Sequence, residues 1–137
     1  MPLPSLTNAG QYTEAGVATL TKVSRTATAD GLTTGTIADA GLIQFVTVTA
    51  TDANHIIVLP SPVPGTIVVL HNGATGYELR SNAPATVLIN AGAGGAAVES
   101  AIAANSTCIM ICVTSLAWKG FFLDADSDLA KVEAAAT

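Results

Sequence analysis

Short apolar runs separated by turn-forming residues follow one another through most of the chain. The runs are rich in β-branched residues, and this pattern is typical of strands rather than helices. The predicted strands cover residues 44–50, 55–59, 65–70, 77–80, 86–89, 106–114 and 117–123. The succession predicts an all-β fold, a single antiparallel β-sandwich or barrel with a jelly-roll-like arrangement.

The segments between the runs carry residues that favour turns. Residues 60–64 contain three prolines, which cannot donate to a central ladder, and Asn72 with Gly73 suits a positive φ. The turn at 81–84 predicts that strands 77–80 and 86–89 form a hairpin. The run at 106–114 is apolar on both faces, which predicts a central strand.

The two ends of the chain differ from this pattern. Residues 1–41 hold two prolines, many Thr and Ala, and too little apolar content for a core element of their own, so we expect an extended N-terminal arm. Residues 42–137 then form the β domain. In the tail at 126–136, Asp and Ser precede strong helix formers, which predicts a short C-terminal helix.

Charge is scarce in this sequence. Only 11% of the residues are charged, against about 25% in an average soluble domain. Two explanations remain open: a surface of Thr, Ser and Asn, or a surface covered by other subunits, because interface cores are depleted in charge. The net charge of −5, with scattered basic residues, argues against nucleic-acid binding.

No apolar stretch approaches the ~18 to 20 residues of a membrane helix. The first twenty residues lack a basic region and an apolar core, so a secretory signal is not expected. We therefore expect a soluble protein without a membrane partner that is made and kept in the cytoplasm, or leaves it only by lysis.

Cys108 and Cys112, with His55 and His71, are the residues that could form a metal site. On a strand, residues four apart are separated by about 13 Å, at ~3.3 Å per residue. That distance is too long for one metal ion or for a mutual disulfide. The spacing predicts that both thiols lie on one buried face as small hydrophobes.

Asp124, Asp126 and Asp128 match the opening of a calcium-binding loop. The match ends at Leu129 and Ala135, where an EF-hand loop requires Gly and Glu. We expect a solvated turn whose carboxylates cap the tail helix, with a cation site as the alternative. The glycines at 92–95 precede no Lys, so a phosphate-binding loop is not expected there.

No constellation for nucleophilic catalysis is evident, since the chain has two His residues and no G-x-S-x-G motif. The prediction is a non-enzyme without catalytic residues, metal or cofactor. Trp118, the single Trp, is expected to pack in or around the core. The alternative is a sugar-stacking platform formed with Tyr77.

Several features in one order resemble small structural domains of tailed bacteriophages. They are Ile57 to Pro60, Pro64 to Leu70, Asn72 with Gly73, the apolar run from Cys108 to Val113, and Trp118. Such domains occur in head decoration proteins and in tail or fibre modules.

The resemblance implies a structural virion protein, most similar to a capsid decoration or cement protein. It would bind the outside of the capsid, stabilise neighbouring major capsid subunits and associate as a homotrimer. Residues 1–36 would contact the capsid or neighbouring subunits. The alternative is a tail, fibre or baseplate module that contacts host glycan or other virion proteins.

Overall fold

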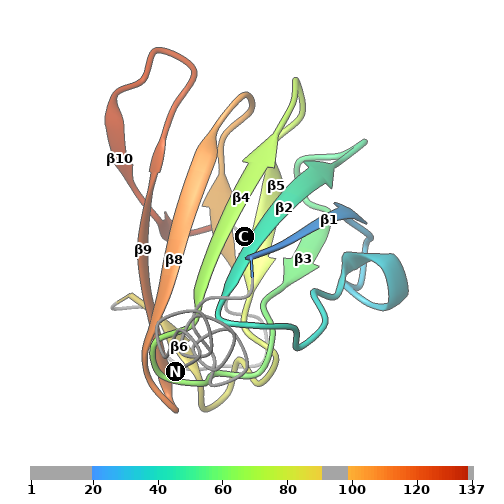
Figure 1. Cartoon of the computed structure of the whole chain (residues 1–137). Coiled ribbons are helices and arrows are strands. Elements are labelled where there is room, and N and C mark those ends of the chain that lie inside the picture. The colour runs from blue at the N-terminus through green and yellow to red at the C-terminus, as the bar shows by residue number, and fades with distance from the viewer. Residues whose placement is uncertain (1–19, 91–98, 136–137) are drawn as a thin grey trace, which may run out of the picture.

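The computed structural model describes residues 20–90 and 99–135, which form two open sheets around a shared core (Figure 1). Sheet A has the strand order β1 (Leu20–Thr26), β2 (Ile43–Thr49), β4 (Ile67–Asn72), β8 (Thr107–Thr114), β9 (Ala117–Leu123) and β10 (Leu129–Lys131), with β6 (Leu88–Ile89) also beside β9. Sheet B has the order β11 (Glu133–Ala134), β7 (Ser100–Ile102), β5 (Tyr77–Arg80) and β3 (Ile56–Val58). Within this part of the chain, the single helical element is the 3₁₀ turn η1 (Thr33–Gly35).

The chain passes back and forth between the two sheets. Strands β2, β4 and β6 belong to sheet A, whereas β3, β5 and β7 belong to sheet B. Leu20 pairs with Ile43 and Ile43 with Ile67, so one turn of this winding takes 23 or 24 residues. The first returns to each sheet keep the same direction, which makes β1, β2 and β4 parallel and β3 and β5 parallel, whereas β7 and β8 return antiparallel. The sheets are therefore mixed, and the expectation of an antiparallel domain was wrong.

Alternation along each strand of sheet A directs every second side chain into the core. Val46 and Val48 on β2 and Met110 on β8 are buried in this way, together with Trp118 on β9. A Cβ atom at Gly120 would collide with the Met110 side chain, so the glycine lets β8 and β9 lie side by side. Strand β8 is flanked by β4 and β9, which confirms the prediction of a central strand.

Two asparagines join segments that lie far apart in sequence. The Asn72 side-chain amide donates to the carbonyls of Thr75 and Ala103, at 2.8 and 2.9 Å, and its oxygen accepts from the Ser106 amide. Asn90 donates to the carbonyls of Gly120 and Val132, at 3.0 and 2.9 Å. These bonds satisfy polar backbone groups at the sheet ends, where ladder pairing stops.

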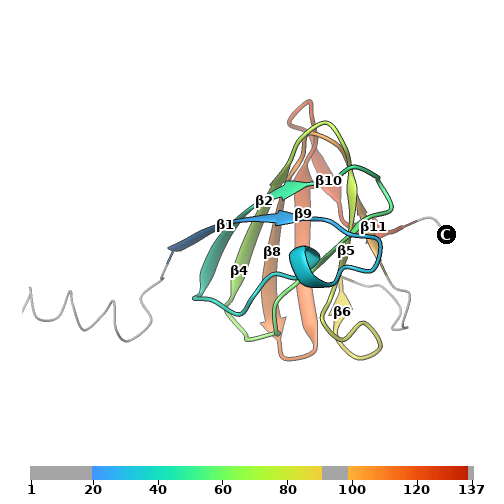
Figure 2. The same cartoon turned by 90° about the vertical axis from the view of Figure 1, so that its right-hand side faces the viewer.

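Much of the predicted N-terminal arm is part of the domain. Residues 20–26 are strand β1, and the segment that follows flanks β3 through bridges from Thr28 to Ile56 and from Thr36 to Val58. Ala27 is buried in the core. Figure 2 shows β1 beside β2. Composition did not reveal this, because β1 alternates exposed residues with partly buried ones and has only Val23 packed against the core. The structure thus shows no boundary near residue 41, and residues 1–19 lie outside the described part.

Two further predictions about pairing were wrong. Strands β5 and β6 belong to different sheets, so they do not form a hairpin. The tail forms β10 and β11 instead of a helix, within the described residues. The backbone of β9 offers pairing partners to Leu129, Ala130 and Lys131, and this tertiary pairing overrides helix propensity.

A truncation tests whether the segment before residue 37 belongs to the domain. Removing residues 1–36 deletes β1 and exposes core that Val23 and Ala27 cover. We expect the free energy of unfolding to fall by roughly 2–3 kcal/mol relative to a chain lacking residues 1–19, at ~0.8 kcal/mol per buried CH₂. Urea denaturation followed by Trp118 fluorescence measures the difference, and equal midpoints would contradict the assignment.

Candidate interaction surface

The outward side of sheet A carries a row of side chains that crosses six strands. Cross-strand pairing connects its members one to the next, from β1 to β10. The row consists of Lys22, Phe45, Val69, Ile109, Phe121 and Lys131. Its four central residues are apolar, and its two ends are lysines. We call it the central row.

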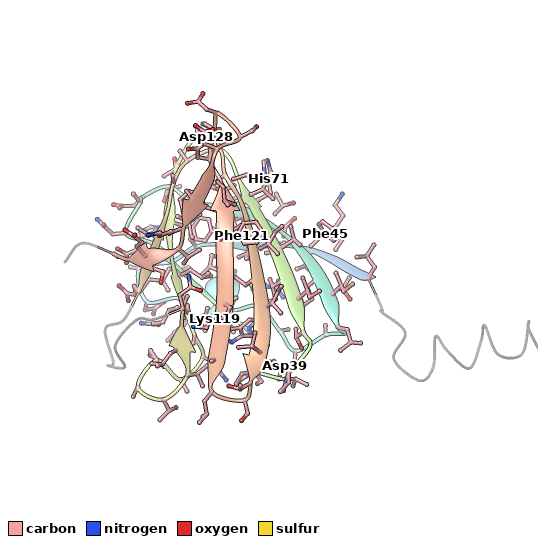
Figure 3. The ribbon with its side chains drawn as sticks, turned by 90° about the vertical axis from the view of Figure 1, so that its left-hand side faces the viewer. Asp39, Phe45, His71, Lys119, Phe121 and Asp128 are labelled. Atoms are coloured by element: carbon pink, nitrogen blue, oxygen red, sulfur yellow. The ribbon has the colours of Figure 1, made fainter. Side chains whose placement is uncertain are left out.

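Two further rows flank the central row on the same side of the sheet. Toward one end of the strands lie Leu20, Ile43, Ile67, Ile111 and Lys119. Toward the other end lie Ser24, Thr47, His71, Thr107, Leu123 and Leu129. We call the three rows together the outer face of sheet A, and Figure 3 looks onto it, with Phe45, His71, Lys119 and Phe121 labelled.

The outer face leaves large apolar side chains in solvent. Phe45 is 44% exposed, Phe121 is 38% exposed and Leu129 is 73% exposed. Beside Phe45 lies a hollow of about 320 Å³, lined by Leu20, Lys22, Thr47, Val69 and His71 among others. His71 on β4 and Thr107 on β8 are neighbours across the two strands, and His71 Nδ1 lies 3.0 Å from the Thr107 hydroxyl. The two polar groups therefore form a hydrogen bond with each other on the outer face.

Charge on the outer face has one sign. The three lysines of the chain, Lys22, Lys119 and Lys131, all lie on it, and none of its residues is acidic. The Lys119 ammonium donates to the Asn90 carbonyl at 3.0 Å. This bond holds the ammonium group beside the outer face, while the methylene chain of Lys119 lies along the face. An apolar centre with charges at the margin has the composition of a protein interface.

The opposite side of the molecule is acidic. The side of sheet B away from sheet A carries a row of Ile56, Glu78, Ala101 and Glu133, in which Ile56 and Glu78 are buried. Arg80 contacts Glu99 at 3.4 Å and donates to the Asp30 carbonyl. Burial, followed by the hydrogen bond and like charge of Glu99, raises the pKa of Glu78 to about 7.

The two cysteines lie in the core, as predicted. Cys108 and Cys112 are buried on the inner side of β8, on the same side as Met110. Burial raises the pKa of the Cys108 thiol to about 12 and also raises the pKa of Cys112. Both side chains therefore stay protonated and act as packing groups. His71 lies on the outer face, on the other side of the sheet.

The three aspartates at 124–128 form the turn between β9 and β10. One Asp124 oxygen accepts from the Asp126 and Asp128 amides, at 3.0 and 2.9 Å, and Ser127 adopts a positive φ of 67°. The carboxylate thus caps a hairpin turn, whereas the sequence predicted a helix cap. Across residues 20–90 and 99–135, no three His, Cys, Asp or Glu side chains are grouped as metal ligands.

Trp118 and Tyr77 are core residues. Trp118 is 0% exposed and Tyr77 is 1% exposed. Neither can stack on a sugar at the surface, so the glycan platform proposed for this pair was wrong. Desolvation raises the pKa of Tyr77 well above its ordinary value.

Two other hollows lie at the ends of the strands. The first has a volume of about 490 Å³, and His71 is the one titratable residue in its lining. The second has a volume of about 270 Å³, and Asp39 is the one titratable residue in its lining. The glycine-rich residues 92–95 lie outside the described part. No described helix is long and apolar enough to cross a membrane.

Sequence reasoning did not single out the residues of the outer face. Phe45 stood next to Val46 in a run whose facing was ambiguous, and Phe121 stood next to Phe122. One signal was available. In the run 106–114 both the odd- and the even-numbered positions carry apolar residues, which indicates a strand that is buried on both of its faces. Comparisons with known families, curated proteins and solved structures found no match to this chain.

The raised pKa of Glu78 gives a pH dependence of stability. A carboxyl whose pKa rises to about 7 on folding contributes stability that is complete below its unfolded pKa, near 4.5. This contribution is lost as the pH rises through 7. We expect the free energy of unfolding to decrease between pH 5 and pH 8, and the decrease to be smaller in Glu78→Gln. Urea denaturation at a series of pH values measures it, and parallel curves for both proteins would contradict the assignment.

Proposed function

We propose that this protein is a structural subunit of a virus particle and that the outer face of sheet A is its contact with neighbouring proteins. The observation that carries the proposal is the central row, in which four apolar side chains, two exposed and two partly buried, lie between two lysines. Large exposed apolar patches on monomeric proteins mark interaction sites.

The size of the outer face suits a specific protein contact. Six strands at ~4.8 Å spacing and three rows at ~6.7 Å spacing give a sheet area of roughly 600 Å². Specific interfaces bury about 800 Å² of accessible surface on each partner. The outer face alone supplies most of that area, since its side chains make the accessible surface larger than the projected one.

The low charge content has the same explanation. Of the two explanations left open by composition, coverage by neighbouring subunits is favoured by the outer face, where six exposed residues are large and apolar and only two are Ser or Thr. A subunit that is permanently covered there needs little charge on that side.

The virion assignment extends the resemblance to phage structural domains. In this proposal the two sheets form a β-sandwich of the jelly-roll type, and the outer face contacts major capsid protein or further copies at the capsid surface. Many identical contacts of modest strength would stabilise the shell through multivalency. Tail or baseplate attachment through the same face is the alternative location.

Incorporation into particles tests the proposal. In gradient-purified particles of the phage that encodes the chain, mass spectrometry should find it at a fixed ratio to the major capsid protein. Phe45→Asp should reduce this ratio at least tenfold, because a carboxylate in the covered face would be desolvated without a partner.

Leu32→Asp is the matched control. Leu32 is 57% exposed but lies before η1, away from the outer face. Its replacement should leave the ratio unchanged, and both variants should show the circular dichroism spectrum of the wild type. Absence of the chain from particles would contradict the virion assignment, and full incorporation of Phe45→Asp would contradict the role of the face.

A further inference from the structure

We infer that the outer face of sheet A binds the outer face of a second copy, around a two-fold axis that runs along the strands between β4 and β8. This deepens the proposed function and rests on it, because it names the occupant of the same surface. It goes beyond the capsid contact, since it requires a dimer of this chain alone.

The central row carries the argument because its order of residue types is the same from either end. Lysine, phenylalanine and a β-branched residue lead from β1 to β4, and the same types lead from β10 back to β8. A two-fold axis between β4 and β8 exchanges the two halves of the row. Phe45 then meets Phe121 of the second copy, and Val69 meets Ile109 of the second copy.

A self-complementary patch is what an isologous contact requires, since each residue must fit its symmetry mate. Val69 and Ile109 are partly buried and lie lowest at the centre, whereas Phe45 and Phe121 stand farther out in solvent. The hollow beside Phe45 lies at the position that Phe121 of the second copy would reach. In packed, aligned sheets the strand directions differ by about 30°. The strands of the two copies would therefore lie slightly oblique to the axis, and the pairs nearest to it would stay in contact.

The flanking rows match this axis only beside it. Ile67 meets Ile111 of the second copy and His71 meets Thr107 of the second copy, like with like. Farther from the axis the pairs are mixed, since Ile43 meets Lys119 and Thr47 meets Leu123. Lys22 and Lys131 fall at the rim, where their stems cover the phenylalanines and their ammonium groups stay in water. Lys119 is already drawn aside by the Asn90 carbonyl.

The lysines at the rim give the contact a salt dependence that identifies the occupant. Lys22 of one copy and Lys131 of the other lie at the same edge, so the dimer has like charges in proximity. Salt screens this repulsion and should tighten the dimer. An acidic protein partner or an anionic lipid surface would instead be released by salt.

The axis also distinguishes this dimer from the trimer that the phage resemblance implies. A three-fold contact joins two different patches of each copy, whereas the central row pairs with itself. A larger assembly would need a second interface elsewhere on the chain.

Sedimentation equilibrium of the purified full chain, at 50 and 500 mM NaCl, tests the inference. The expected result is a reversible monomer–dimer equilibrium that is tighter at high salt. Phe45→Glu and Phe121→Lys should each weaken it at least tenfold. The combination of both in one chain should recover at least tenfold over either single variant. The reason is that the carboxylate introduced at position 45 would face the ammonium group introduced at position 121 of the second copy.

The combined variant protects the test against misfolding, because a chain that fails to fold cannot recover dimerisation. Leu32→Asp serves again as the control and should dimerise like the wild type. A chain that stays monomeric, a dimer that weakens with salt, or a combined variant no tighter than the singles would each overturn the inference. A monomer that still needs Phe45 for particle incorporation would overturn the dimer and leave the proposed function standing.

Discussion

A sheet that is apolar on both faces must be covered on both, and this constraint governs the whole molecule. Sheet B and the segment that flanks it cover one side of sheet A, where Val46, Met110 and Trp118 lie. The other side carries Phe45, Ile109 and Phe121, and the described chain provides no layer for it. The hydrophobic effect that closes the core therefore also favours a neighbour on the outer face.

The two outward surfaces differ in chemistry. The three lysines lie on sheet A, while Glu78, Glu99 and Glu133 lie on or beside the strands of sheet B. Glu133 is exposed on sheet B, whereas Glu78 is buried there and has a raised pKa. The outer face of sheet A has no carboxylates, which would be costly to desolvate in a contact.

The positions of most strands could be predicted from the sequence, because β-branched runs bounded by Pro, Asn and Gly have few other structures available. Strand β5 matches its predicted range, 77–80, in full. The sheet to which each strand belongs could not be predicted. Runs such as 67–72 place apolar residues on both sides of the strand, so they do not indicate which sheet they join. Strand β1 was missed because Leu20 and Val23 are its only large apolar residues and do not alternate with period two. The tail was predicted as a helix because pairing with β9 is a tertiary effect. The low charge content left a covered surface as one of two explanations, and Phe45 and Phe121 could be placed on the outer face only once the strand register was known.

The winding between the sheets has a consequence for how the chain acquires its structure. Parallel neighbours such as Leu20, Ile43 and Ile67 are 23 or 24 residues apart in sequence, so they pair only after the segment between them has been placed. Closing such loops costs entropy before any contact repays it, and domains dominated by distant pairings fold slowly. The hairpin of β8 and β9 is the most local pair of long strands, and it is synthesised after the parallel strands. During synthesis the early strands therefore have unpaired edges, which are prone to aggregation. Low protein concentration or a chaperone would then raise the yield of native protein.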